Sequence, residues 1–186
     1  DYKTFVPGSC GRPVVHMEVK IDSHDPENVP GEILARGLNV MLGYYKNEEA
    51  TQNTLDKEGW YHTGDLGTMD AEGNIFIKGR SKNMLLSSNG QNIYPEEIED
   101  QLNSLPMVME SVVVQRGDKL AALVHPDFEE AKTMGLSTDD LQKLMEENRT
   151  TINAELPAYS KITEIEIHED EFEKTPKKSI KRYLYK

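Results

Sequence analysis

Glycine is distributed unevenly along the chain, and this feature constrains the fold more than any other. Eleven of the 13 glycines lie within residues 1–90, and only Gly117 and Gly135 follow. Glycine favours turns because it adopts backbone conformations with positive φ at no steric cost. We therefore expect a turn-rich first part dominated by strands, followed by a compact part that contains helices.

Helical periodicity begins in the second part of the chain. The segment 95–97, a proline and two glutamates, suits the first turn of a helix, because proline fits there and acidic side chains complement its positive end. Ile98, Leu102 and Leu105 then repeat at the spacing of one helix face. A second helix is expected from the capping segment 137–140 to Leu156.

Alternation of apolar and polar residues predicts strands on both sides of this change. We expect strands at residues 14–21, 32–36 and 74–78, and later at 111–116, 119–125 and 162–167. The sequence thus predicts an α+β fold, in which a strand-rich part precedes a smaller α/β part whose mixed sheet is flanked by helices.

Composition excludes several classes of function. The chain has 186 residues, a net charge of −12 and one cysteine, Cys10. The acidic balance disfavours nucleic-acid binding, which depends on neutralising phosphates. No apolar run approaches the roughly 18 residues of a membrane-spanning helix, and a single cysteine excludes internal disulfides. We expect a cytoplasmic protein, with peripheral membrane association and oligomeric state left open.

Two common kinds of chemical site are absent from the sequence. It contains neither a G-x-x-x-x-G-K-[ST] phosphate loop nor a G-x-G-x-x-G dinucleotide motif. The five histidines show no metal-ligand spacing, and one cysteine cannot complete a zinc site. We therefore predict no metal site formed by this chain alone.

Four stretches together carry a more specific signal. They are Gly31–Gly37 continuing to Gly43–Tyr45, then Gly59–Leu66, then Gly79–Lys82 running on through Ser88–Glu99, and finally Thr175–Arg182. In this order and spacing the chain resembles the C-terminal third of the adenylate-forming enzymes. Its Asn92–Glu99 segment and its Ile180–Tyr185 ending look most like those of long-chain fatty acid–CoA ligases.

The resemblance implies a two-step reaction. A carboxylate attacks ATP to give an acyl-adenylate, and the thiol of CoA then attacks that adenylate. ATP or AMP, Mg²⁺ and CoA are the implied cofactors, with Mg²⁺ held mainly by an N-terminal domain. In this family a small C-terminal domain rotates between the steps. Residues 1–80 would then be the end of the large AMP-binding domain, 81–82 the hinge, and 83–186 the small domain.

The resemblance also indicates what this chain lacks. In the family, the phosphate loop and the acyl pocket lie upstream of the matching stretches. We therefore expect a fragment of a fatty acid–CoA ligase that is inactive alone. Two alternatives remain: an acyl–acyl carrier protein ligase with the same two steps, and a non-catalytic module that binds a nucleotide or a protein.

Asp65 and Arg80 are the expected nucleotide-binding residues. Asp65 falls in a Thr-Gly-Asp turn, and its carboxylate would accept hydrogen bonds from both ribose hydroxyls, as acidic residues do in dinucleotide sites. Arg80 would contact the ribose or a phosphate through its fork of donors. Without the resemblance, Asp65 would be interpreted as a turn residue capping its own loop, and Arg80 as part of a surface ion pair.

The resemblance assigns roles to two further positions. Lys82 occupies the hinge position, where the backbone turns while the side chain stays in water. Gly90 lies in a hairpin-like turn and would stand beside the pantetheine arm of CoA, where a Cβ would narrow the channel. A turn glycine that needs positive φ is compatible with the same role.

The C-terminal tail departs from the family pattern. The family's catalytic lysine usually stands immediately before the Ile-x-Arg element, and here Ser179 occupies that position. Lysine would neutralise negative charge on the reacting carboxylate and α-phosphate, which serine cannot do. We predict that Lys178 takes this role. Lys181, or no lysine at all, are the alternatives.

The tail is also unusual in charge. Lys174–Lys186 contains six basic residues and no acidic one. Because like charges repel, and because we expect only the acidic run Glu169–Glu173 to compensate them, we predict a tail that is mobile or held by incidental contacts, with Lys178 exposed to solvent.

Overall fold

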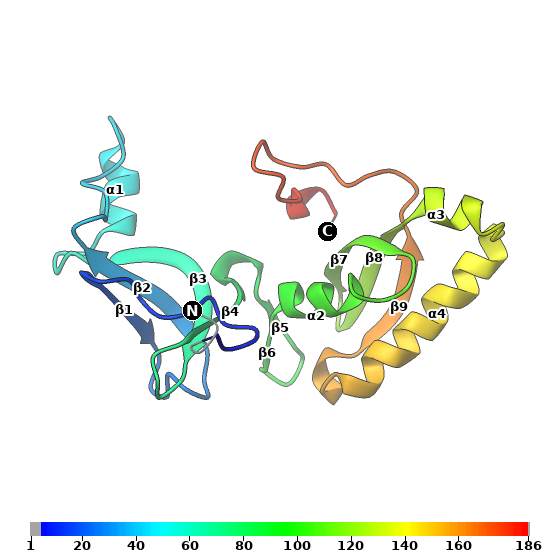
Figure 1. Ribbon diagram of the computed structural model, residues 1–186, viewed down its shortest axis with the longest axis horizontal. Coiled ribbons are helices and arrows are strands. Elements are labelled where there is room, and N and C mark those ends of the chain that lie inside the picture. The colour runs from blue at the N-terminus through cyan, green and yellow to red at the C-terminus, as the bar shows by residue number, and fades with distance from the viewer. Residues whose placement is uncertain (1–4, 186) are drawn as a thin grey trace. The chain divides into compact units, whose positions relative to one another are not determined.

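A meander of four antiparallel strands organises the first part of the chain (Figure 1). The computed structural model describes residues 5–185. The strands are β1 (Met17–Asp22), β2 (Gly31–Gly37), β3 (Tyr61–Met69) and β4 (Ile75–Arg80), paired in chain order, with the short helix α1 (Glu48–Thr54) between β2 and β3. The core of this sheet is small, with Ile21, Ile33 and Ile75 buried together.

The second part is built on a three-stranded mixed sheet (Figure 1). Its elements are the hairpin β5 (Leu85–Leu86) and β6 (Asn92–Ile93), then α2 (Pro95–Leu102), β7 (Val108–Arg116), β8 (Lys119–Pro126), α3 (Phe128–Thr133), α4 (Thr138–Glu155) and β9 (Ile162–Ile167). Single 3₁₀ turns lie at Ser81–Asn83, Ala158–Ser160 and Arg182–Leu184. Strand β8 pairs antiparallel with β7 and parallel with β9, because α3 and α4 connect β8 to β9.

Both faces of this mixed sheet are covered, by different layers. One face packs against the helices: Val113 and Ala122 contact a core that includes Leu102 of α2 and Met145 of α4. The opposite face carries a second core, formed by Val112, Val114, Ala121, Leu123 and Phe172, with Ile180 and Tyr185 packed against it. Successive strand residues point to opposite faces, so burial on both faces explains the long apolar runs of β7 and β8.

The expected α+β fold class, including the mixed sheet, is confirmed. Strand β9 and the second long helix lie where their patterns predict them. Helix α2 ends at Leu102, and Leu105 packs against the core beyond its end. No sequence pattern predicted β3 or the short helices α1 and α3. Residues 61–69 contain two glycines and lack strict alternation, so no strand pattern shows there.

The chain divides into two compact units, Asp1–Asn83 and Met84–Lys186. The division falls just after the predicted hinge at residues 81–82. Across the residues that the structure describes, no helix is both long enough and apolar enough to cross a membrane.

Candidate functional site

Strand pairing brings together the two residues predicted to bind a nucleotide. Asp65 of β3 and Arg80 of β4 are direct cross-strand partners. The Arg80 Nη1 atom donates to Asp65 Oδ1 at 2.6 Å and to the Thr63 carbonyl at 3.1 Å. The two side chains keep 35 % and 46 % of their surface exposed. An exposed carboxylate and guanidinium, held in fixed relative positions, can offer an acceptor and donors to one ligand.

Asp65 lies within strand β3 and not in a tight turn, which corrects the sequence-based expectation. The strand is irregular at this point: Gly64 has a φ of +72°, and the β2–β3 register shifts between Glu32 and Leu34. A bulge of this kind re-aims side chains along a strand. The Thr-Gly-Asp segment therefore bends the backbone at Gly64, as a turn would, but strand β3 continues through it.

Glu32 fixes this irregular segment, a role that no sequence pattern predicted. Its Oε1 accepts a hydrogen bond from the Gly64 N–H at 2.9 Å, and its Oε2 lies 2.8 Å from His62 Nδ1. Thr63 adds a hydrogen bond from its Oγ1 to the Ile33 carbonyl at 2.7 Å. Because these contacts cross from β2 to β3, some 30 residues apart, spacing along the chain gives no signal for them.

The predicted hinge and CoA-side residues are both exposed on short elements. Lys82 lies in the 3₁₀ turn Ser81–Asn83, next to the division between the two units. Gly90 forms the tip of the β5–β6 hairpin with a φ of +79°, and a Cβ built there would meet no atom within 4 Å. Its N–H donates to the Ser87 carbonyl at 2.9 Å. The backbone conformation thus favours glycine here.

Lys178 lies at the end of a tight loop that closes a small hairpin in the tail. The N–H of Lys178 donates to the Thr175 carbonyl, and the Thr175 N–H donates to the Ser179 carbonyl, each at 2.8 Å. Lys178 itself is exposed and has a φ of +62°. A turn followed by one left-handed residue is a common three-residue hairpin loop. The loop therefore presents the Lys178 side chain to solvent, as expected.

Within the described part, residues 174–185, the tail carrying this loop is held by ion pairs that the prediction of a mobile or incidentally held tail did not include. Lys174 Nζ lies 2.7 Å from Glu110 Oε1, and Lys181 Nζ lies 3.0 Å from Glu173 Oε2. Arg182 forms an ion pair with Glu99. The prediction overlooked compensating carboxylates on α2 and β7, because they are distant in sequence. Lys186, the sixth basic residue, lies outside the described residues.

The carboxylate of Glu99 is the most strongly perturbed group of this region. Burial raises the pKa of Glu99 to about 7, although the Arg182 charge and a hydrogen bond from the Val113 N–H act in the opposite direction. Lys181 behaves differently, since its hydrogen bond to Glu173 raises the pKa of its ammonium group. Lys181 is thus engaged within the tail.

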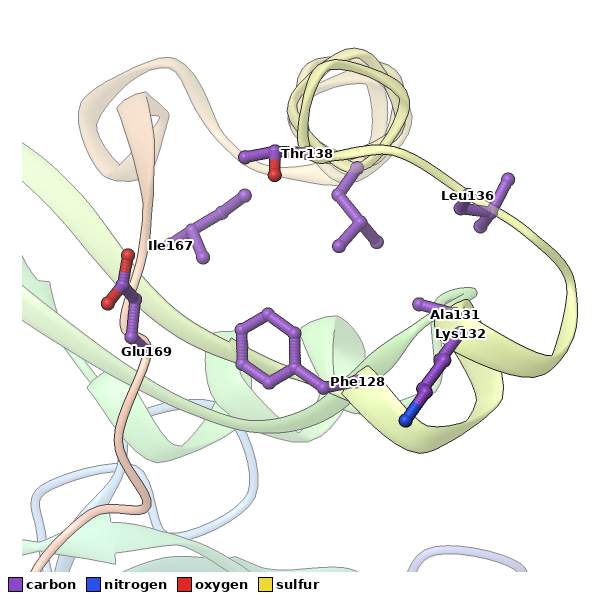
Figure 2. Close-up of a pocket in the computed structure, with 8 residues that line it drawn as sticks. Phe128, Ala131, Lys132, Leu136, Thr138, Ile167 and Glu169 are labelled. Atoms are coloured by element: carbon purple, nitrogen blue, oxygen red, sulfur yellow. The ribbon is translucent and has the colours of Figure 1, made fainter.

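A separate hollow lies between α3, the start of α4 and the end of β9 (Figure 2). It has a volume of about 470 Å³. Phe128, Ile167 and Leu141 form its apolar wall, and Lys132 and Glu169 add charge at its edge. None of the predicted site residues lines it. Within residues 5–185, no three His, Cys, Asp or Glu side chains gather in a way that could hold a metal ion.

Comparison with known proteins identifies the family. A sequence model described as the AMP-binding enzyme C-terminal domain matches residues 82–185. The chain belongs to the adenylate-forming, AMP-binding enzymes. The predicted resemblance is thereby confirmed, and it extends over both units: the O-succinylbenzoate coenzyme A synthetase of Bacillus subtilis, solved with ATP and a magnesium ion, is 27 % identical with a TM-score of 0.74, covering 95 % of this chain and 35 % of that one.

Curated relatives of this adenylate-forming chain are CoA ligases. The 2-succinylbenzoate–CoA ligase of Bacillus cytotoxicus is 42 % identical over 122 residues, and the indoleacetate–CoA ligase of Aromatoleum aromaticum is 42 % identical over 128 residues. Each match covers 64 % of this chain and 25 % of the relative. The chain thus spans about a quarter of the length of these relatives. Their names give no support to a long-chain fatty acid as the substrate.

Proposed function

We propose that this chain is the C-terminal part of an ATP-dependent acid–thiol ligase, which joins a carboxylic acid to CoA through an acyl-adenylate. The observation that carries the proposal is the family match over residues 82–185, which includes the lysine-rich tail. The neighbouring unit supplies the paired Asp65 and Arg80 side chains. The full-length protein would provide the rest of the site.

In this proposal, Asp65 accepts hydrogen bonds from the ribose hydroxyls. Its Oδ1 atom already receives the Arg80 hydrogen bond, so Arg80 orients the carboxylate while it stays open to solvent. Glu32 stabilises this arrangement by accepting a hydrogen bond from the N–H of Gly64, the residue before Asp65. Rigid placement matters because a carboxylate binds two vicinal hydroxyls only in a narrow range of orientations.

Lys178 is the proposed catalytic lysine of the adenylation step. As carboxylate and α-phosphate approach, negative charge gathers between them, and an ammonium group nearby stabilises it. Two observations support Lys178 over Lys181. Lys178 is exposed at the end of its loop, whereas the Lys181 ammonium is bound to Glu173.

Rotation about residues 81–82 would exchange the two catalytic arrangements. Exposure of Lys82 on a single 3₁₀ turn supports a hinge here, because the backbone can change direction with little loss of packing. In the second arrangement, Gly90 would lie beside the pantetheine arm of CoA. Magnesium would be held mainly by the N-terminal domain of the full-length protein, as the resemblance implies.

The acid itself is left to experiment. Long-chain fatty acids come first, because of the Asn92–Glu99 and Ile180–Tyr185 segments. The names of the relatives add 2-succinylbenzoate and indoleacetate. The test is ATP–pyrophosphate exchange by the full-length protein with each acid, followed by mass-spectrometric detection of the thioester with CoA or, in parallel, with acyl carrier protein. We expect exchange with one acid class and a CoA thioester, and no exchange by the 186-residue chain alone. Absence of exchange with every acid would overturn the proposal.

A further inference from the structure

A buried ion pair joins the tail to helix α2. The Glu99 side chain is 9 % exposed and that of Arg182 is 20 % exposed, and the Arg182 Nη2 atom donates to Glu99 Oε2. Glu96, one turn earlier on the same helix, lies 3.8 Å from Arg182 Nε. Two carboxylates of α2 thus face one guanidinium of the tail.

The same pair also satisfies the edge of the mixed sheet. Strand β7 is an edge strand, and the Val113 N–H donates to Glu99 Oε1 at 2.6 Å while the Val113 carbonyl accepts from Arg182 Nη1 at 3.4 Å. A buried backbone group without a partner is costly. Helix, strand and tail are therefore linked by one closed set of hydrogen bonds.

This link lies just after the C-terminal end of the loop that presents Lys178. Arg182 follows Lys178 by four residues, after Ile180 has entered the core on the second face of the sheet. The other ion pairs of the tail are more exposed: the Lys181–Glu173 pair has one partner 65 % exposed, and the side chains of the Lys174–Glu110 pair are 29 % and 27 % exposed. Ion pairs contribute less as they become more exposed to solvent. Loss of one partner from a buried pair is far more disruptive.

We propose that Glu99 is a positioning residue, which acts through Arg182 to hold the Lys178 loop in the place that adenylation requires. The inference rests on the proposed function, since it assigns Lys178 its role. Glu99 touches no reacting group. Its effect passes through the guanidinium of Arg182 and the short segment between that residue and Lys178.

A double-mutant cycle in the full-length protein tests this coupling. We expect Glu99→Gln to slow ATP–pyrophosphate exchange at least about tenfold and to leave thioester formation from preformed acyl-adenylate within about twofold. In a Lys178→Ala background, Glu99→Gln should slow ATP–pyrophosphate exchange by less than a further factor of about two. Once the lysine is absent, the position of its loop no longer affects the rate. Glu146→Gln is the matched control, since Glu146 pairs with Arg149 on α4, and it should leave both steps unchanged.

Hydrogen exchange on the same proteins separates this inference from the proposed function. Amides of residues 174–182 should exchange faster in Glu99→Gln than in wild type, while those of β9 stay unchanged. If the wild type shows no activity with any acid, the proposed function fails. Hydrogen exchange alone then decides whether Glu99 holds the loop. The inference would be overturned if hydrogen exchange in residues 174–182 were unchanged in Glu99→Gln. It would also be overturned if Glu99→Gln slowed ATP–pyrophosphate exchange equally in the wild-type and Lys178→Ala backgrounds. If Glu99→Gln does not fold, Arg182→Lys takes its place in both measurements.

Discussion

The lysines of the tail differ in whether they form ion pairs or are exposed to solvent. Lys178 is exposed at its turn, and Lys174 and Lys181 are held by Glu110 and Glu173. Their roles can therefore be separated by substitution, because Lys174 and Lys181 hold the tail, whereas Lys177 and Lys178 are exposed.

Replacing Lys178 with alanine in the full-length protein should slow acyl-adenylate formation at least about tenfold, about 1.4 kcal/mol of transition-state stabilisation. Thioester formation from preformed acyl-adenylate should be nearly unchanged. Single-turnover assays of the two half-reactions measure this. Lys177→Ala is the control, since Lys177 is exposed in the same loop. A loss with Lys181→Ala but not with Lys178→Ala would show that the tail is wrongly aligned with the family.

Asp65→Asn should raise the KM for ATP at least about tenfold, because an amide replaces one acceptor oxygen by a donor and loses the charge that holds Arg80. Glu72→Gln is the matched control, as an exposed carboxylate on the β3–β4 turn of the same hairpin. Steady-state kinetics at saturating acid and CoA measure the effect. Equal KM values for Asp65→Asn and wild type would remove Asp65 from the nucleotide site.

At the scale of elements, sequence and structure agree best where one element carries its own signal. Capping and periodicity place α4, since Ser137 and Asp140 form a reciprocal capping box. The Asp65–Arg80 pair could be predicted as two residues but not as neighbours, because their contact depends on the register of β3 with β4. The anchoring of the tail lay outside prediction for the same reason: Glu99 and Arg182 are 83 residues apart.

At Gly90, on the β5–β6 hairpin, the effect of a substitution on backbone conformation can be told apart from its effect on CoA binding. Alanine there meets open space but must adopt a left-handed conformation, at a cost of about 1 kcal/mol. Gly90→Ala in the full-length protein should therefore fold, keep its rate of adenylation, and slow thioester formation as the Cβ narrows the CoA path. Asn89→Ala, at the same hairpin tip, is the control. Equal rates of thioester formation in Gly90→Ala and wild type would exclude Gly90 from that path.

Helix α2 and the tail should respond to pH through Glu99. Its pKa is about 7 in the folded protein and near 4.5 when unfolded, so the folded state binds the proton more tightly. Protonated Glu99 therefore favours the folded state, and its ionisation costs stability, on the order of 3 kcal/mol, as pH rises from 4.5 through 7. The ionised carboxylate still binds Arg182 and sets the place of the tail, because a buried ion pair can fix geometry without adding net stability. Denaturant unfolding at pH 5 and pH 8 should show this loss in wild type but not in Glu99→Gln. An equal pH dependence in both proteins would contradict it.

At the scale of the whole molecule, the two units differ in how completely they bury their own apolar residues. Met84–Lys186 has a core on each face of its sheet. The first unit buries a small cluster of three isoleucines and, outside it, Leu34, Trp60 and Leu66, while Leu38, Leu42 and Tyr45 are each at least 88 % exposed. Stability follows from the apolar area removed from water, so the second unit has the stronger basis for independent folding.

We therefore expect residues 84–186, produced alone, to fold cooperatively, with the tail still anchored on the second face of the sheet. Residues 1–83 alone should be marginal or unfolded, because a cluster of three isoleucines, with Leu34, Trp60 and Leu66 buried outside it, supplies too little burial to offset the entropy of ordering the chain. Circular dichroism during heating, and amide spectra of 84–186 compared with the 186-residue chain, measure this. Retained resonances for the mixed sheet and the tail are the expected result. Loss of the tail resonances in 84–186 would mean that the tail is held by more than the contacts to Glu99, Glu110 and the second core. A cooperative transition in 1–83 would show that its exposed leucines and tyrosines do not limit its stability.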